Sequence, residues 1–211
     1  MIKEFEKRLL SSLVLIPVAV FFIIQGSLFF IFFLSILFLI SCYEWLKINK
    51  NNNLLKFLGI TFLLLSFYAT FEIREYRSLK YFWFIVIICI FTDIGGYVFG
   101  KIFKGPKLTK ISPNKTYAGV FGSFSLSLIS SLIYLNYYGI KEIADTNYLL
   151  ILLLILFISL ISQIGDLIIS YFKRKAKVKN TGKILPGHGG LLDRVDGLIF
   201  VMPTIYLLGK I

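Results

Sequence analysis

Residues 9–43 read LLSSLVLIPVAVFFIIQGSLFFIFFLSILFLISCY, and this stretch contains no charged side chain. A single helix over it would be roughly 50 Å long at 1.5 Å per residue, whereas the hydrocarbon core of a bilayer is about 30 Å thick. We therefore expect two helices with a turn at Gln25-Gly26-Ser27. Lipid offers the backbone no hydrogen-bond partners, so helices are the structure expected for such segments.

The rest of the chain has the same apolar character. Hydrophobic residues make up 57% of the 211 residues, compared with roughly 45–50% in an ordinary soluble domain. Successive apolar runs predict an all-α fold, a polytopic transmembrane helical bundle of about seven spans. The expected spans are residues 8–24, 28–46, 54–71, 81–100, 117–138, 148–172 and 195–209.

The basic residues lie mostly between these spans and are divided unequally between the two sides. If the N-terminus is cytoplasmic, 18 of the 23 lysines and arginines lie on the cytoplasmic side. Membrane proteins carry excess positive charge on that side, so this orientation is the one we expect. The net charge of +12 then reflects membrane orientation and an anionic substrate, and we expect no nucleic-acid partner. The expected location is the cell membrane.

Two other features are interpreted structurally. The apolar run that follows Lys3, Lys7 and Arg8 is too long for a signal peptide and has no small-residue cleavage pattern, so we expect a retained anchor. Cys42 and Cys89 lie inside apolar segments without the spacing of metal ligands. We expect them to be buried thiols.

Two aspartates lie inside expected spans, near the ends that should face the cytoplasm. They are Asp93, in Thr92-Asp93-Ile94-Gly95-Gly96, and Asp166, in Ser162-Gln163-Ile164-Gly165-Asp166. A carboxylate in a bilayer costs several kcal/mol and normally faces a partner or a wet cavity. Each aspartate is therefore either a functional group or the structural partner of a lysine on a neighbouring helix.

Glycines, cations and carboxylates gather in the residues that follow Asp166. The chain continues through Ser170, Lys173-Arg174 and Lys179 to Pro186-Gly187-His188-Gly189-Gly190 and Asp193-Arg194-Val195-Asp196. Carboxylates hold Mg²⁺ together with substrate phosphates, cations neutralise a transferring phosphoryl group, and glycines let backbone N–H groups approach phosphate oxygens. This combination suits a nucleoside triphosphate.

The same stretch also has a plain structural interpretation. The glycines can form a tight turn before the last span, and the lysines can be an orienting basic loop near anionic headgroups. Asp193 and Asp196 share a face only if a helix has begun there. His188, the only histidine, cannot form a zinc site with two distant cysteines. It is a candidate general acid, phosphate hydrogen-bond donor or turn stabiliser.

A second cluster precedes the fifth expected span, in Ser112-Pro113-Asn114-Lys115-Thr116-Tyr117-Ala118-Gly119. A hydroxyl, a lysine and free N–H groups at a helix N-terminus form a good anion site. The alternative is a capped helix start after a proline turn. The segment does not match the Walker pattern.

These residues together resemble the phosphatidate cytidylyltransferase (CDP-diacylglycerol synthase) family. Its signature of Ser, Lys-Arg, Lys-Asp, Pro-x-His-Gly-Gly and Asp-Arg-x-Asp is met at fixed separations, and the resemblance covers roughly residues 90–200. The chain departs from the pattern at Asn180, where the family has aspartate, and at Ala118, often Glu or Gln. The matching signature residues are Ser170, Lys173, Arg174, Lys179, Gly182, Pro186, His188, Gly189, Gly190, Asp193, Arg194 and Asp196.

The resemblance implies roles for particular residues. Asp166 and Asp193 would be the Mg²⁺ ligands, and these two aspartates with Lys173 and Arg194 would be the catalytic residues. A second, monovalent cation is a further possibility. The substrate-binding residues would be Ser112, Lys115, Thr116, Asp93, Ser170, Arg174, Lys179, His188, Gly189, Gly190 and Asp196.

The expected reaction is cytidylyl transfer from CTP to phosphatidic acid, in a homodimer by resemblance. Residues 1–80 would be N-terminal transmembrane helices, and residues 81–211 the catalytic transmembrane region with cytoplasmic basic loops and a cytoplasmic active site, all in one membrane domain. Two alternatives stay open. A CTP-dependent polyprenol or phytol kinase would transfer the γ-phosphate instead, and a small transporter would use Asp93 and Asp166 to line an ion path.

Overall fold

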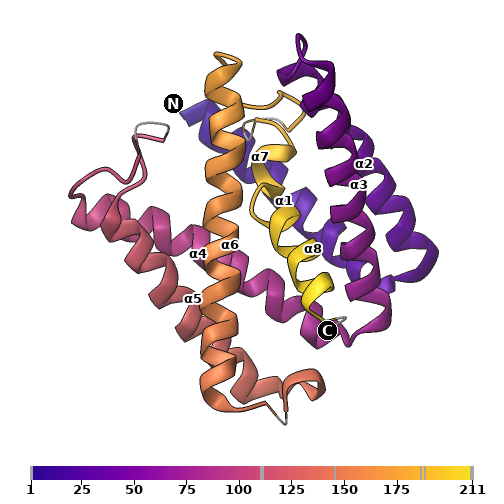
Figure 1. The fold of residues 1–211 in the computed structure, drawn as a ribbon, viewed down its shortest axis with the longest axis vertical. Helices are drawn as coiled ribbons and strands as arrows, with labels where there is room; N and C mark the ends of the chain where they lie inside the picture. Colours follow the sequence, from indigo (N-terminus) through magenta and orange to yellow (C-terminus); the bar gives the residue numbers. More distant parts are fainter. Residues whose placement is uncertain (1, 110–111, 145, 186, 188, 210–211) are drawn as a thin grey trace.

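The computed structural model of the protein is built from helices (Figure 1). It describes residues 2–109, 112–144, 146–185, 187 and 189–209, with side chains from residue 11 onward. No strand is assigned in this part of the chain, which has two isolated bridges. The helices are α1 (Ile2–Gln25), α2 (Ser27–Ile48), α3 (Asn53–Tyr76), α4 (Leu79–Phe103), α5 (Tyr117–Tyr138), the 3-10 helix η1 (Lys141–Ile143), α6 (Tyr148–Lys175), α7 (Leu192–Val195) and α8 (Leu198–Leu208).

The expected turn in the long apolar stretch is confirmed. Gly26 separates α1 from α2 and has a φ of +67°, a conformation that glycine adopts without strain. Arg74 of α3 closes the end of α1, donating to the carbonyl oxygens of Ile23 at 2.7 Å and Ile24 at 2.8 Å. A cation at this position also complements the negative end of the helix dipole.

Five helices, α2 to α6, are long and apolar enough to cross a membrane. The chain is therefore a multi-pass membrane protein. The other two expected spans are not among these helices: α8 is shorter, and of α1 only the part with described side chains, Ser11 to Gln25, enters the comparison. The expected boundaries of the other five lie within a few residues of the observed ones.

The expected last span, residues 195–209, needs correction. The chain forms the single turn α7 up to Val195 and then a separate helix, α8, which begins at Leu198 and contains Pro203. The 11 residues of α8 measure roughly 16 Å along the axis, about half of a hydrocarbon core. The break falls at Asp196 and Gly197, the polar and flexible residues at the start of the expected span.

Small residues bring α4 and α5 into close contact. A side chain on Gly95 would collide with the carbonyl of Gly122, and the Ser123 hydroxyl donates to the Thr92 carbonyl at 2.7 Å. Small residues at helix interfaces allow backbones to approach closely in membrane proteins. The paired helices hold Asp93 of α4 in a fixed place beside α6.

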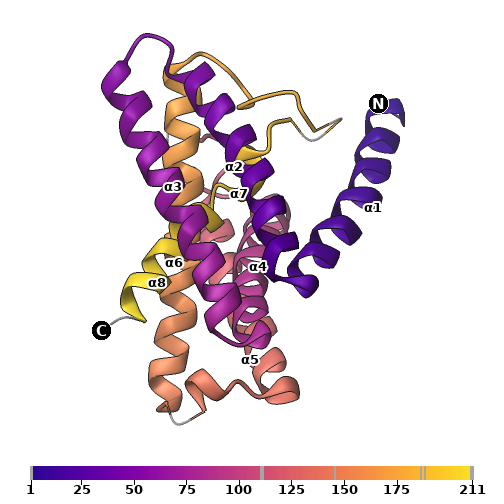
Figure 2. The same cartoon turned by 90° about the vertical axis from the view of Figure 1, so that its right-hand side faces the viewer.

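The last helix lies inside the bundle. Figure 1 shows α8 between α6 and the α2–α3 pair, and Ser66 of α3 donates to the carbonyl of Ile199 at 2.7 Å. Figure 2 shows that α1 diverges from the other helices beyond its turn with α2. The connections α2–α3, α4–α5 and α6–α7 lie at one end of the bundle, and the connections α3–α4 and α5–α6 lie at the other (Figures 1 and 2).

Candidate active site

The loop between α6 and α7, residues 176–191, carries most of the signature and folds back on itself. Leu185 and Gly189 exchange two backbone hydrogen bonds, of 3.0 and 3.1 Å. Gly187 and Gly189 have φ values of +75° and +88°, which favour glycine. Pro186 and His188 lie outside the described residues, so the roles expected for His188 stay predictions.

Asp193, in the single turn α7, accepts hydrogen bonds from two separate parts of this loop. Its Oδ2 accepts from the backbone N–H groups of Thr181 at 2.8 Å and Gly190 at 3.1 Å, and it lies 3.1 Å from the Thr181 hydroxyl oxygen. Its Oδ1 forms an ion pair with Lys173 of α6 at 2.8 Å. Asp193 therefore holds the loop closed and fixes the lysine.

Asp166 of α6 forms the centre of a second cluster. Its Oδ2 lies 2.7 Å from the Nζ of Lys115, and its Oδ1 accepts from the Ser170 hydroxyl at 3.2 Å. This is the lysine partner that the structural interpretation of a membrane aspartate anticipates. Both side chains are partly exposed, however, at 23% for Lys115 and 30% for Asp166, so the pair is open to a ligand.

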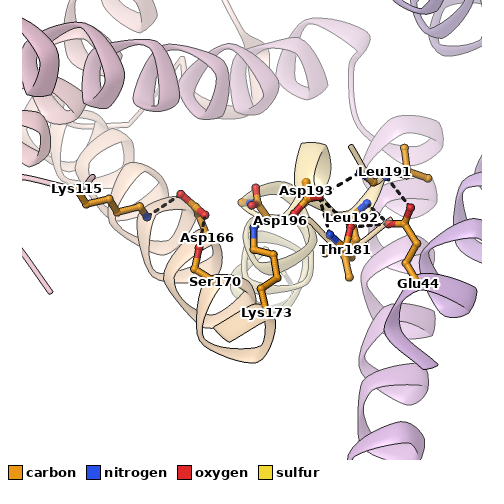
Figure 3. A network of polar contacts seen from close by, with 12 residues as sticks. Glu44, Lys115, Asp166, Ser170, Lys173, Thr181, Leu191, Leu192, Asp193 and Asp196 are labelled. Atoms are coloured by element: carbon orange, nitrogen blue, oxygen red, sulfur yellow. Dashed lines mark hydrogen bonds and ion pairs between the residues drawn. The ribbon is translucent and has the colours of Figure 1, made fainter. Parts of the chain in front are cut away.

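Asp196 joins the two clusters. Figure 3 shows it with Lys173 between Asp166 and Asp193. The Asp196 side chain is buried, and its Oδ1 accepts from the N–H of Gly197 at 3.0 Å. Burial, and then the negative charges of Asp166 and Asp93, raise the pKa of Asp196 well above its ordinary value. The carboxylates of this group repel one another, and a cation would relieve that repulsion.

The segment before α5 shapes the approach to Lys115. Thr116 caps α5, since its hydroxyl accepts from the N–H of Gly119 at 3.1 Å. The N–H of Leu108 donates to the carbonyl of Lys115 at 2.8 Å, so the basic loop folds back beside the helix start. The Ser112 carbonyl accepts from the N–H of Lys115 at 3.0 Å. The capped-helix alternative is thus correct for Thr116. Of Ser112, Lys115 and Thr116, Lys115 is the one whose side chain contacts the Asp166 carboxylate, and it also lies 3.4 Å from the Gln163 carbonyl.

The two glycines after His188 shape the loop. The N–H of Gly189 donates to the Leu185 carbonyl and that of Gly190 to Asp193. Both groups are engaged within the loop, so the structure supports the tight turn that was the alternative interpretation. Asn180, the departure from the family pattern, packs against Gly189, and nothing in the structure explains Ala118.

The remaining basic residues lie on the rim of the site. Arg174 in the last turn of α6, Lys179 in the loop and Arg194 in α7 are all exposed. Asp93 is also exposed, on α4, and it is close enough to interact electrostatically with Asp166, Lys115 and Arg194. A helix does begin before Asp193, as the sharing of a face by Asp193 and Asp196 required.

Glu44 of α2 is fully buried and was not among the residues expected in the site. Its carboxylate contacts the loop and the start of α7 (Figure 3). The signal that could have found it is the one used for Asp93 and Asp166, a carboxylate inside an expected span. Glu44 lies near the end of the expected span 28–46, next to the polar connection that follows, so its charge does not stand out in the sequence.

The donor set is compatible with a magnesium ion that completes its coordination from a substrate. Within the described residues, no three His, Cys, Asp or Glu side chains form a ready metal cluster. Mg²⁺ usually takes one or two carboxylates, with phosphates and water filling the other positions. Asp166 and Asp196 fit that requirement because their carboxyl groups are neighbours whose negative charges interact. Asp193 is already paired with Lys173 through Oδ1 and with the loop through Oδ2, so a metal ion there would compete with these contacts.

Helices that can cross a bilayer, with carboxylates and cations gathered around one loop, define an integral membrane protein with a phosphate-compatible site. Residues 54–211 match the sequence model of the cytidylyltransferase family. The chain belongs to this family. The match begins earlier than residue 90, where the sequence resemblance began, and it leaves α1 and α2 outside.

Individual relatives agree with this assignment. The chain is 36% identical over 209 residues to a phosphatidate cytidylyltransferase of Rickettsia typhi, covering 94% of this chain and 89% of the relative. It is 40% identical over 154 residues to one of Staphylococcus saprophyticus, covering 72% and 56%, and 39% identical over 147 residues to one of Bacillus subtilis, covering 68% and 53%. The chain thus spans most of the rickettsial relative and slightly more than half of the other two.

Replacing Asp193 with Asn should loosen the loop of residues 176–191. The amide keeps one acceptor oxygen and loses the charge, so the hydrogen bonds from the loop weaken even when the amide oxygen takes the place of Oδ2. One such hydrogen bond is worth about 1 kcal/mol, which predicts about fivefold faster trypsin cleavage after Lys177, Lys179 or Lys183. Limited proteolysis followed by mass spectrometry measures this.

Asp166→Asn is the matched control, because the contacts of Asp166 are to Lys115 and Ser170 rather than to the loop. Its cleavage rate should equal that of the wild type. Equal rates for both variants would contradict the role given to Asp193.

Proposed function

We propose that this protein transfers the cytidylyl group of CTP to phosphatidic acid, giving CDP-diacylglycerol and pyrophosphate. The observation that carries the proposal is the double cluster Lys115–Asp166 and Lys173–Asp193, joined by Asp196 at one end of a membrane bundle. Membership of the cytidylyltransferase family and the relatives named phosphatidate cytidylyltransferase support it. The reaction places a lipid phosphate and a nucleotide at the same membrane surface, which is where this cluster would lie.

The reaction is an in-line displacement at phosphorus. An oxygen of the phosphatidic acid phosphate attacks the α-phosphorus of CTP, a new P–O bond forms, and the bond to the β-phosphate oxygen breaks. A phosphate monoester has a second pKa of about 6, so it is largely ionised at neutral pH and requires no strong general base. Lys115 and Lys173 offset the charge on the transferring group and on pyrophosphate.

We further propose that Mg²⁺ is held by Asp166, with Asp196 or Asp193 as the second carboxylate. Bound there, the ion would neutralise phosphate charge. Arg174, Lys179 and Arg194 on the rim would then contact the nucleotide phosphates. A second, monovalent cation, the homodimer and the phosphate contacts of Ser112, Thr116, Ser170, His188, Gly189 and Gly190 stay predictions.

The first test is product analysis with purified protein in detergent, phosphatidic acid, labelled CTP and Mg²⁺. We expect CDP-diacylglycerol and pyrophosphate, with EDTA abolishing both products and added Mg²⁺ restoring them. A CTP-dependent lipid kinase would instead transfer the γ-phosphate of CTP to an alcohol and leave CDP. CDP formation, or no CTP turnover by a folded protein, would contradict the proposal.

Asp166→Asn should lower the turnover number by about 100-fold or more, the scale of losing one preorganised electrostatic contact at a transferring group. The variant keeps the side-chain volume but removes the charge that would bind the ion. Steady-state rates over a Mg²⁺ titration measure the effect. Glu75→Gln is the control, because Glu75 accepts from Ser27 beside the α1–α2 turn, away from the cluster, and its rate should be normal. A near-normal Asp166→Asn rate would remove Asp166 from the metal site.

We propose that the end of the bundle carrying the site faces the cytoplasm, together with the N-terminus. The excess of basic residues at this end supports that orientation. Single cysteines at Asn51, in the α2–α3 connection, and at Tyr137, at the end of α5, test it in a background without Cys42 and Cys89. A membrane-impermeant maleimide should label only Tyr137→Cys in right-side-out vesicles and only Asn51→Cys in inverted ones. The reverse pattern would overturn the orientation.

A further inference from the structure

Glu44 is a carboxylate placed where a carboxylate is costly. It lies on α2, whose composition is otherwise almost entirely apolar, and its exposed fraction is 0%. A buried charge is tolerated only when its oxygens are fully satisfied by donors. The position therefore requires an explanation in terms of what Glu44 holds.

Three donors satisfy the two oxygens. Oε1 accepts from the N–H of Leu191 at 3.0 Å, and Oε2 accepts from the N–H of Leu192 at 2.9 Å and from the Thr181 hydroxyl at 2.8 Å. Leu191 and Leu192 form the start of α7, and Thr181 lies near the middle of the signature loop. Glu44 thus connects α2 to the loop at Thr181 and to the start of α7 (Figure 3).

The contacts of Glu44 and Asp193 share a residue. The Thr181 hydroxyl lies 2.8 Å from Glu44 Oε2 and 3.1 Å from Asp193 Oδ2, while the Thr181 N–H donates to Asp193 at 2.8 Å. Asp193 in turn holds Lys173 at 2.8 Å. Hydrogen bonds and one ion pair therefore connect Glu44, through Thr181 and Asp193, to Lys173, which we propose offsets charge on the transferring group.

The loop is also shaped to fit around this carboxylate. A side chain on Gly182 or on Gly190 would collide with the Glu44 carboxylate, and one on Gly190 would also collide with the Thr181 hydroxyl. Gly190 does not have a positive φ, so its backbone conformation does not require glycine. Its lack of a side chain serves the close approach of Glu44 rather than a turn.

We propose that Glu44 is a positioning residue for catalysis, which sets the place of Asp193 and Lys173 through Thr181 and the start of α7. The inference rests on the proposed function. It assigns a catalytic task to α2, which lies outside the part of the chain that matches the family. Residues that orient a ligand-binding residue without touching the ligand themselves typically affect activity by about 10- to 100-fold.

The test compares Glu44→Gln with Glu142→Gln in the cytidylyl transfer assay. Glu142 is a matched control, because its carboxylate also accepts from a backbone N–H and a hydroxyl, those of Ser78 at 2.6 and 2.9 Å, at the opposite end of the bundle. In Glu44→Gln the amide NH₂ must face a donor of the loop. We expect kcat to fall about 10- to 100-fold in Glu44→Gln and to stay within about twofold of wild type in Glu142→Gln.

A merely structural role for Glu44 would lower the thermal midpoint and leave kcat of the folded protein at the level of Glu142→Gln, which would overturn the inference.

Thr181→Val keeps the test decisive if Glu44→Gln does not fold. It should lower kcat by about 3- to 10-fold, the scale of one hydrogen bond, and normal turnover would count against the relay. Where both fold, the double variant should be no slower than Glu44→Gln, because the residues act through one path.

The assay separates this inference from the proposed function. A folded wild-type protein that makes no CDP-diacylglycerol would overturn both. An active wild type with Glu44→Gln as fast as Glu142→Gln would overturn the inference alone.

Discussion

A carboxylate that is removed from water has to be matched by donors or cations, and this constraint organises one end of the bundle. Glu44, Asp166, Asp193 and Asp196 each solve it differently: with neutral donors, with a lysine, with both, and with a raised pKa. Because the partners come from α2, α6, the α6–α7 loop and the segment before α5, satisfying these charges also brings those elements together. The architecture of the site is in this sense a consequence of its electrostatics.

The helices supply the rigidity that this arrangement needs. Glycines and serines draw α4 against α5, and α8 is held between α3 and α6 through contacts such as that of Ser66 with Ile199. In a bilayer, hydrophobic burial gives little preference for one helix neighbour over another, so close backbone approach and polar contacts determine the packing. The polar residues inside the spans therefore contribute to packing as well as chemistry.

Much of the fold was predictable from sequence because it depends on local composition. The turn at Gly26 follows from the length of the uncharged stretch, and five spans follow from apolar runs. The division of residues 195–209 into α7 and α8 was not predictable, since the break depends on how Asp196 and Gly197 pack against α6. In the site, the signature identified Asp193 and Lys173 but not their pairing. Glu44 was missed because its donors lie more than a hundred residues away, at Thr181, Leu191 and Leu192.

The contacts of Glu44 with residues far along the chain limit how the N-terminal helices can be replaced. The family match begins at residue 54, so by that match alone the helices before it would be a membrane anchor that can be replaced without effect on the site. The side chain from α2 nevertheless completes the hydrogen bonding of a loop that begins at residue 176. Removal of the N-terminal helices, or their exchange for helices without this carboxylate, would leave two backbone N–H groups without their acceptor. The two parts of the chain are therefore constrained to vary together.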